Sequence, residues 1–280
     1  ETAETIIQSI GWQTGRTGTV TPVLRVEPTM VSGATISNVT AHHAGMIRDK
    51  RLGVGARIEI IRSGEVIPKL ERVIEEADNV ALIDACPSCQ TPLVWDNDFL
   101  RCTNHGACPA QTQTGIFYWF KTLGSADGFG PKSIEKLTDG GYTTLQQMYA
   151  LTVEQLTPLG FGDKQAENLV ASLEISLQTN VEDARFLSAF GIPNLGIGDS
   201  RKLLAHYRLR ALEHITTEQI AAIKGFGEKT SGAIAEQLRE RWPTIAHMLA
   251  LGFNLEATPL LSEQAEIASP VSGRVVMFTG

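Results

Sequence analysis

The sequence predicts a multidomain α+β protein that combines a small β-barrel, a four-cysteine zinc finger and an all-α domain of repeated helical hairpins. Three observations lead to this fold class: an N-terminal region rich in β-branched residues, a single segment that holds all four cysteines, and a glycine-containing motif that recurs four times. With 280 residues, 42% of them apolar, the chain has material for two or more domains. We expect the barrel over residues 1–76, the zinc finger over 77–115, the helical domain over 116–255 and a last segment over 256–280.

The N-terminal region has the pattern of short β-strands. The segments TGTVTPVLRVEP, GATISNVTAHH and ARIEIIRSGEVIPKLERVI alternate in places and are interrupted by Gly and Pro at turn positions. About five or six such strands are too few for a large sandwich and favour a small barrel. Between Gly11 and Arg72 the chain has nine Lys and Arg against five Asp and Glu, a net charge of +4. This balance favours an oligonucleotide-binding (OB-type) barrel, although other small barrels share the strand pattern.

The cysteine segment, CPSCQTPLVWDNDFLRCTNHGACPAQ, has the spacing of a zinc site. Cys86 and Cys89 are separated by two residues, twelve residues follow, and Cys102 and Cys108 are separated by five. Four thiolates in two close pairs suit tetrahedral Zn²⁺, and the role is structural because they leave no position for water. A structural zinc contributes about 10 to 16 kcal/mol to folding against about 2 to 4 for a disulfide, and a short segment with little apolar content needs the larger contribution. Two disulfides are the competing interpretation, which an intracellular setting opposes, and His105 is an alternative ligand to Cys102 or Cys108.

The helical region repeats the motif G-[FI]-G-x-[KS] four times, at intervals of about thirty residues. A helical run follows each copy and another precedes three of them, which predicts helix, tight glycine hairpin, helix. A P-loop and a dinucleotide-binding loop each need a preceding strand and a fixed glycine spacing. Both are absent here, so these two kinds of nucleotide-binding loop are excluded. Glycine permits positive φ, the apolar residue anchors the loop, and the N–H groups that begin the second helix favour an anion such as a DNA phosphate. The alternative is that these glycines are only helix C-caps.

Individual backbone N–H groups and a few lysines, rather than a broad positive electrostatic field, must hold DNA at these hairpins. The whole chain has a formal charge of -7, and from Lys121 to Gly252 thirteen Lys and Arg stand against fifteen Asp and Glu. The candidate contacts are two glycines and the following Lys or Ser of each copy: Gly128, Gly130, Lys132, Gly160, Gly162, Lys164, Gly196, Gly198, Ser200, Gly225, Gly227 and Lys229. No run of eighteen apolar residues and no signal peptide occur, so we expect a soluble intracellular protein.

Taken in order, these motifs resemble those of bacterial NAD-dependent DNA ligases. The segments GWQTGRTGTVTPVLRVEP, VSGATISNVTAHH and RSGEVIPKL, the cysteine segment ending CTNHGACPAQ and the four hairpins follow one another as they do in that family. The resemblance covers nearly the whole chain and implies the C-terminal portion of such a ligase, with an OB-fold, a zinc finger and a helix-hairpin-helix domain. The final GRVVMFTG resembles the first strand of a BRCT domain.

The resemblance also implies that the chemistry of the family is carried by residues that this sequence lacks. The lysine that takes AMP from NAD lies in a K-x-D-G motif, which does not occur here, since Lys136 in KLTDG has one residue too many. We therefore expect no catalytic residue, and NAD and Mg²⁺ would belong to a missing nucleotidyltransferase domain that is a partner of this chain. The chain alone, a fragment or split product, would be inert. It would encircle nicked double-stranded DNA for nick sealing in replication and repair, as a monomer in the bacterial cytoplasm, associated with the nucleoid.

Single positions have narrower expectations. We expect Arg16 and Thr17 in the GRTG loop to contact phosphate or the minor groove, against the alternative of a solvated turn. The basic run at residues 48–51 is more typical of a solvated face, and the four tryptophans are expected in cores rather than as stacking platforms. His43 and Ser200 depart from the Asn and Lys that are usual in the family, so the resemblance does not carry its contacts over to these two positions.

Two other classes of function were weighed. A stand-alone zinc-containing scaffold of barrel and hairpins would bind DNA without a ligase parent, and a K-x-D-G motif upstream in the reading frame would exclude it. A zinc-dependent hydrolase is disfavoured because nothing in the sequence resembles an open metal site or a paired acid and base.

Overall fold

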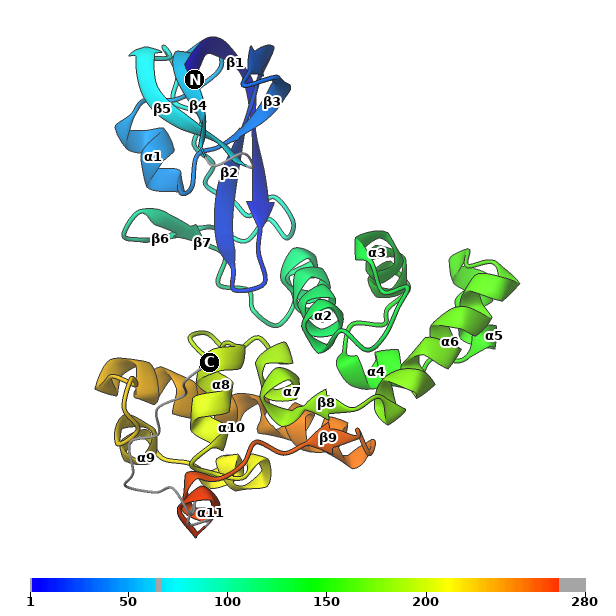
Figure 1. Cartoon of the computed structure of the whole chain (residues 1–280). Coiled ribbons are helices and arrows are strands. Elements are labelled where there is room, and N and C mark those ends of the chain that lie inside the picture. Colours follow the sequence, from blue (N-terminus) through cyan, green and yellow to red (C-terminus); the bar gives the residue numbers. More distant parts are fainter. Residues whose placement is uncertain (1, 64–66, 267–280) are drawn as a thin grey trace, which may run out of the picture. The chain divides into compact units, whose positions relative to one another are not determined.

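The structure is a computed structural model that describes residues 2–63 and 67–266. The chain forms two compact units, residues 1–114 and 115–280, and each is described by itself. The first unit holds the long strands and the cysteine segment, and the second holds the hairpin helices (Figure 1). The segment GRVVMFTG, with its predicted BRCT strand, lies outside the described residues.

Five strands form the barrel: β1 (Thr2–Thr14), β2 (Thr19–Val31), β3 (Ala34–Thr40), β4 (Arg57–Ser63) and β5 (Ile67–Glu75). Antiparallel pairs join β1 to β2, β2 to β3, β5 to β4 and β4 to β1, while β3 and β5 run parallel. The sheet therefore closes on itself, which removes the open edges that a short domain could not otherwise protect. The predicted small OB-type barrel in a mixed α+β chain is confirmed.

Alternate residues of the strands fill the interior of the barrel. Ile7, Leu24 and Ile58 are fully buried there, and Ile47 of helix α1 (Ala44–Asp49) belongs to the same core. This arrangement follows from the period of two that places successive strand side chains on opposite faces.

Helix α1 is capped by His43, the residue at which the resemblance led us to expect Asn. The backbone N–H of Met46 donates to Nδ1 of His43, the N-cap residue, at 3.2 Å. Asn is a preferred N-cap residue for the same reason, since its side chain offers an acceptor to the first turn. His43 therefore supplies the cap that Asn would supply.

A short hairpin attaches the cysteine segment to the barrel sheet. Strands β6 (Val94–Asp96) and β7 (Phe99–Arg101) pair with each other, and β7 also pairs with the start of β2, where Val20 lies opposite Leu100. Both of these apolar side chains are buried in a small core with three of the cysteines. The hairpin thus extends the barrel sheet to seven strands.

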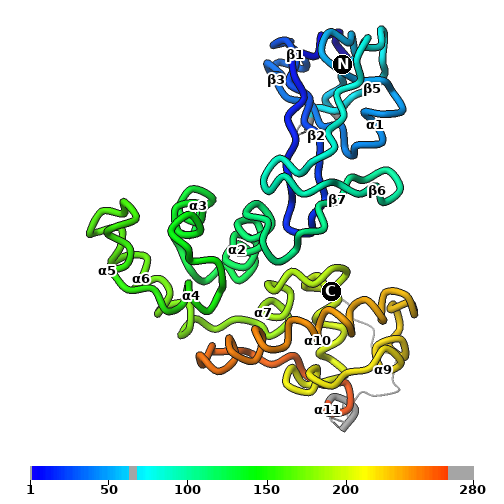
Figure 2. Tube along the Cα trace, turned by 180° about the vertical axis from the view of Figure 1, so that it is seen from behind, coloured from blue at the N-terminus to red at the C-terminus, as the bar shows by residue number. Residues whose placement is uncertain are grey.

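Up to residue 266, where the described part of the second unit ends, this unit is helical apart from one short parallel pair of strands, β8 (Val181–Glu182) and β9 (Leu255–Glu256). Helix α9 packs against the long helix α10, and α7 packs against α8 (Figures 1 and 2). Helix α2 begins directly after Cys108 and runs into this unit. The helices are α2 (Pro109–Leu123), α3 (Pro131–Asp139), α4 (Leu145–Tyr149), α5 (Val153–Leu156), η1 (Thr157–Leu159), α6 (Asp163–Gln178), α7 (Asp183–Ala189), α8 (Ile197–Leu204), η2 (Leu209–His214), α9 (Thr217–Ala221), α10 (Glu228–Ala250) and α11 (Leu261–Glu266).

One aromatic cluster lies in the core of the helical unit. The indole ring of Trp119 is fully buried and meets the rings of Phe186, Phe190 and Phe253 at centroid distances of 5.5, 4.8 and 6.1 Å. These residues come from α2, α7 and the segments that follow α7 and α10. All four hairpins are therefore built on one continuous hydrophobic core.

The expectation for the tryptophans holds at three positions and is wrong at one. Trp119 and Trp242 are buried, and Trp12 is half-buried against the barrel core. Trp95 is 41% exposed, because its three-residue strand belongs to a hairpin that is covered on only part of its surface. The guanidinium of Arg48 lies 4.8 Å from the centroid of its ring.

Candidate metal centre and nucleic-acid interface

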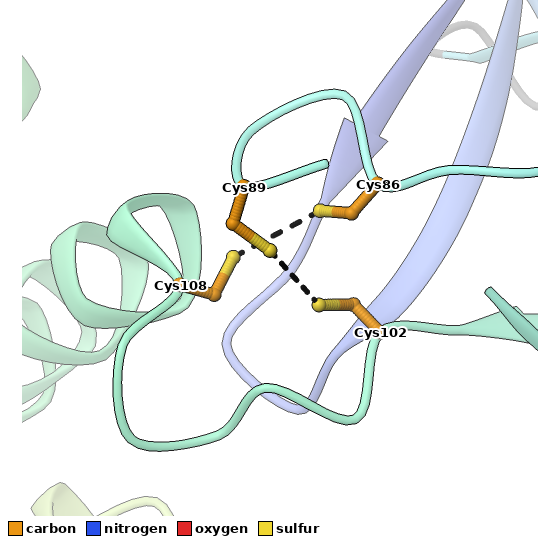
Figure 3. A group of neighbouring side chains, drawn as sticks. All are labelled: Cys86, Cys89, Cys102 and Cys108. Atoms are coloured by element: carbon orange, nitrogen blue, oxygen red, sulfur yellow. Dashed lines mark hydrogen bonds between the residues drawn. The ribbon is translucent and has the colours of Figure 1, made fainter. Parts of the chain in front are cut away.

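The four cysteines converge on one point. Their Sγ atoms all lie within 4.8 Å of one another, with 3.9 Å between Cys86 and Cys108 and 3.5 Å between Cys89 and Cys102 (Figure 3). Sulfurs bound at about 2.3 Å to a tetrahedral zinc are about 3.8 Å apart, so the four side chains are placed to bind one metal ion. All four are free cysteines, which opposes the interpretation as two disulfides.

Short structural elements bring these residues together. Cys86 and Cys89 lie in the loop before β6, Cys102 directly follows β7, and Cys108 directly precedes α2. Because β7 is paired with β2, Cys102 is fixed by the barrel sheet rather than by its own loop. The two cysteine pairs of the sequence thus approach the site from different segments, one from the loop before β6 and one from the loop between β7 and α2.

Hydroxyl groups and burial act on the thiols in opposite directions. Oγ1 of Thr91 lies 3.3 Å from Sγ of Cys89 and lowers the pKa of that thiol to about 6. Burial raises the pKa of Cys102 to about 12. A bound cation is what would hold the Cys102 sulfur as a thiolate, so metal binding at this site releases a proton.

His105 is not a member of the ligand cluster. Its Nδ1 lies 2.9 Å from Oε1 of Gln111, and Nε2 of Gln111 donates to the carbonyl of Cys102 at 3.1 Å. The histidine therefore supports the backbone beside a ligand and does not replace one. Across the part of the chain that the structure describes, the four cysteines form the only group arranged for a metal.

The GRTG loop is the tight turn from β1 to β2. Gly15 N–H donates to the carbonyl of Thr19 and Gly18 N–H to that of Gly15, both at 2.9 Å. Gly18 has φ of +79°, and a Cβ at this residue would lie 2.3 Å from the carbonyl oxygen of Cys102. Of the two predicted contacts, Thr17 is exposed and Arg16 is half-buried. The close approach of the cysteine segment thus explains why residue 18 is a glycine. Thr17 lies at the surface, and Arg16 is partly exposed there.

Three of the four glycine hairpins have the predicted form. Gly128, Gly160 and Gly225 have φ of +86°, +82° and +103°, and two residues later an extended glycine is the N-cap of the following helix. The residues between the paired glycines are buried apolar anchors: Phe129, Phe161 and Phe226. The helix that leads into the second hairpin is α5 with η1, and the preceding α4 is a separate helix.

The predicted register of the third hairpin is wrong by two residues. Asn194, with φ of +60°, stands in place of the first glycine, the buried Leu195 is the anchor, and Gly196 is the N-cap of α8. Gly198 consequently falls at the second position of the helix, where the other copies have lysine. Asn tolerates the left-handed region, so the turn forms without the glycine that the motif requires.

Ser200, predicted as a polar counterpart of those lysines, is fully buried. Its N–H donates to the carbonyl of Gly196 at 2.8 Å, in the same way that Ser231 N–H donates to that of Gly227 at 2.8 Å. The side chain lies one turn inside the helix and is not at the surface of the hairpin.

The other predicted cations lie at the surface. Lys132, Lys164 and Lys229 each occupy the second position of their helix and are exposed, and Nζ of Lys164 lies 3.9 Å from Glu167. In the basic run, Arg48 pairs with Asp49 and Asp98, and Arg51 pairs with Glu76. The run is exposed, as expected of a solvated face, and two of its arginines are also ion-paired.

Comparisons with known proteins agree with this architecture. Residues 4–81 match the family model described as the NAD-dependent DNA ligase OB-fold domain. Residues 120–174 and 186–240 each match the SAM-like helix-hairpin-helix tandem. No helix among the described residues has the length and apolar character needed to cross a bilayer.

Curated relatives match along the whole chain. A DNA ligase of Desulfatibacillum aliphaticivorans is 52% identical over 280 residues, which are all of this chain and 44% of the relative. A DNA ligase of Shewanella baltica is 46% identical over all of this chain and 43% of the relative. One of Natronomonas pharaonis is 35% identical over 84% of this chain and 35% of the relative. The chain spans less than half the length of the relatives it matches.

Proposed function

We infer that this chain, whose barrel belongs to the OB-fold domain family of NAD-dependent DNA ligases, is the DNA-binding, C-terminal portion of such a ligase. The observation that carries the inference is the similarity to DNA ligases over the full chain. The match of residues 4–81 to the ligase OB-fold model supports it. The geometry supports it, because a closed OB-type barrel and four helix-hairpin-helix units are both suited to nucleic acid.

Each hairpin would bind the DNA backbone through the first turn of its second helix. The first-turn N–H groups after Gly130, Gly162, Gly196 and Gly227 have no carbonyl partner within the helix and would face a bound phosphate, which the helix dipole favours. Pro131, the first residue of α3, contributes no N–H group. At three hairpins a lysine at the second helical position adds a positive charge. The third hairpin has Gly198 there and would bind by backbone alone. Such contacts read phosphates and not bases, which suits an enzyme that acts on any sequence.

The barrel would contribute the loop between β1 and β2. Arg16 and Thr17 are the residues of the GRTG turn that we propose to contact a phosphate or the minor groove, while Gly15 and Gly18 shape the turn. Barrel and hairpins would bind the same nicked duplex, and nick sealing in replication and repair is the activity that this binding would serve.

The metal is proposed to be a structural Zn²⁺. Four sulfur donors at tetrahedral separations fit zinc, and a site with four protein ligands leaves none open for a reacting water. The ion would supply folding free energy and no chemical step. No residue of this chain is assigned to adenylyl transfer, and NAD and Mg²⁺ would be bound by a nucleotidyltransferase domain.

Salt-dependent binding to nicked duplex tests this function. If each hairpin meets about two phosphates, about eight contacts make log K fall with log salt at a slope of about -7. Fluorescence anisotropy of a labelled nicked duplex, titrated with the chain from about 50 to 200 mM salt, measures the slope. A flat dependence would contradict binding through four hairpins.

Addition of a nucleotidyltransferase domain from a relative tests the link to ligation. The chain alone should seal no nicks, and the mixture with NAD and Mg²⁺ should seal more than the added domain does by itself. A mixture no more active than the added domain would favour a stand-alone DNA-binding scaffold.

A further inference from the structure

The helical unit is a tandem, and its two halves can be compared position by position. Residues 120–174 and 186–240 match the same model, and helices α3 and α8 begin at the equivalent N-caps Gly130 and Gly196. Six residues after each N-cap stands a lysine, Lys136 in the first half and Lys202 in the second. Both side chains are exposed, and neither belongs to the repeated glycine motif.

Each of these lysines reaches from its own helix to the next hairpin loop. Nζ of Lys136 donates to the carbonyl of Gly160 at 3.0 Å and lies 5.0 Å from the ring centroid of Phe161, the anchor of the second hairpin. A Cβ built on Gly160 would lie 3.9 Å from Nζ of Lys136, and one built on Gly225 would lie 3.8 Å from Nζ of Lys202. The two ammonium groups thus occupy equivalent places beside the second and fourth hairpins.

The hairpins that receive a lysine are those whose helix begins with an acid. Helix α6 begins with Asp163 and α10 with Glu228, whereas α3 and α8 begin with Pro131 and Ile197. A carboxylate in the first turn favours the helix dipole but repels a phosphate that approaches the same N–H groups. A cation from the neighbouring helix offsets that repulsion at α6 and α10, whereas the first-turn acid of α8, Asp199, is paired with Lys202 of the same helix.

The two halves differ in what holds the lysine. Nζ of Lys202 lies 2.9 Å from Oδ1 of Asp199, an ion pair within α8. The equivalent position in α3 is Ser133, which has no charge. An ammonium group has three donors, so Lys136 keeps two of them for another acceptor after its bond to Gly160.

We propose that Lys136 is a further phosphate-binding residue, which fixes the loop of the second hairpin and contacts the DNA phosphate held there. Lys202 is its counterpart at the fourth hairpin, where the ion pair with Asp199 weakens its contact with phosphate. The proposal rests on the proposed binding of DNA by the hairpins. It assigns to DNA binding a pair of lysines that lie outside the repeated motif.

Substitution of Lys136 tests the first half of the proposal in the full chain. Lys136→Gln should weaken binding of nicked duplex about 5- to 10-fold near 100 mM salt and make the salt slope shallower by about 1, because one phosphate contact is lost. Lys136→Arg should retain most of both. Arg239→Gln removes the same charge from an exposed position far along α10 and should change affinity less than about twofold.

Two outcomes would overturn the assignment of Lys136. If Lys136→Gln behaves like Arg239→Gln, the lysine makes no contact with DNA. If Lys136→Gln lowers affinity and thermal stability but leaves the salt slope unchanged, the lysine only supports the loop.

A double-mutant cycle tests the role of Asp199. Asp199→Asn should tighten binding about 3- to 5-fold when Lys202 is present and by clearly less in a Lys202→Gln background, where only the direct repulsion between Asp199 and a phosphate at the third hairpin is relieved. Glu236→Gln, an equal change of charge on the exposed face of α10, controls for the overall field. An equal gain from Asp199→Asn with and without Lys202 would contradict the proposed role of the ion pair between Lys202 and Asp199.

These results separate the present inference from the proposed function. Wild-type chain that fails to bind nicked duplex in a salt-dependent manner would refute the function itself. Wild-type chain that binds with a steep slope, while the Lys136 and Asp199 variants are indistinguishable from their controls, would refute only the role of these lysines.

Discussion

Gly18 shows how one residue is determined by a distant part of the chain. Its left-handed φ would already disfavour a side chain, and the carbonyl of Cys102 occupies the place of a Cβ at 2.3 Å. Its own carbonyl accepts a hydrogen bond from Cys102 N–H at 2.8 Å. The residue therefore joins the β1–β2 turn to the metal-binding segment through the backbone. The sequence indicated a turn here, but nothing local could reveal which segment packs against it.

Gly18→Ala should destabilise the first unit much more than a substitution at a matched glycine. Gly33 also has positive φ, at +75°, but a Cβ there meets no atom within 4 Å. Gly33→Ala should therefore cost only the left-handed strain of about 1 kcal/mol, and Gly18→Ala about 1 to 3 kcal/mol more, because the backbone must shift. Hydrogen exchange measured by mass spectrometry on peptides from residues 1–114 compares the two local free energies. Equal losses would show that the close approach to Cys102 is unimportant.

At the scale of the element, the third hairpin defines what a hairpin of this kind requires. A residue that can adopt positive φ, a buried anchor and an extended N-cap recur in all four copies, and two glycines do not. The motif G-[FI]-G found the third copy but gave it the wrong anchor, because Ile197 and Gly198 mimic the pattern two residues late. Burial, which only the tertiary structure reveals, identifies Leu195 instead.

The corrected register predicts unequal effects for two neighbouring apolar residues. Leu195 is 1% exposed and should cost about 2 to 5 kcal/mol when replaced by Ala, through lost transfer energy and a cavity. Ile197, half-buried at the first helical position, should cost less than about 1 kcal/mol in Ile197→Ala. Urea denaturation followed by circular dichroism at 222 nm measures both. A larger loss at Ile197 would restore the register that the motif suggests.

Other elements were predictable to the extent that their signals are local. The cysteine spacing gave the metal cluster, and the repeated glycines with their inner Phe gave three hairpins with the right anchors. The pairing of β7 with β2 joins residues about eighty positions apart and has no signature in either strand. Lys136 is likewise unremarkable in the sequence, since its contact with Gly160 depends on how two helices pack.

At the scale of the whole molecule, the metal site belongs to one unit and the aromatic core to the other. The four cysteines belong to the first unit, residues 1–114, while the aromatic core around Trp119 lies in the second. The second unit has a large core of its own and needs no metal for its stability. Each unit can therefore respond by itself to a change in conditions.

Removal of the metal should unfold part of the first unit and spare the second. Reduced protein should contain one zinc per chain by mass spectrometry, and chelation should abolish protection from hydrogen exchange around residues 86–108, because binding free energy at such sites is folding free energy. Protection of α6, α8 and α10 should remain. Replacement of His105 by Ala should leave the zinc content unchanged, which serves as a control because this side chain is outside the ligand cluster. A zinc content near zero in reduced, unchelated protein would refute the site.

The strand pairing between β2 and β7 gives the metal a second consequence. Thr19 and Val20, at the start of β2, are covered by Arg101 and Leu100 of the hairpin that the cysteines hold in place. Loss of that hairpin would leave main-chain donors and acceptors at the start of β2 without partners on that side and uncover the buried side chain of Val20. Such an edge is a template on which a second chain can add a strand. By covering this edge, the cysteine segment would oppose self-association in addition to its part in folding.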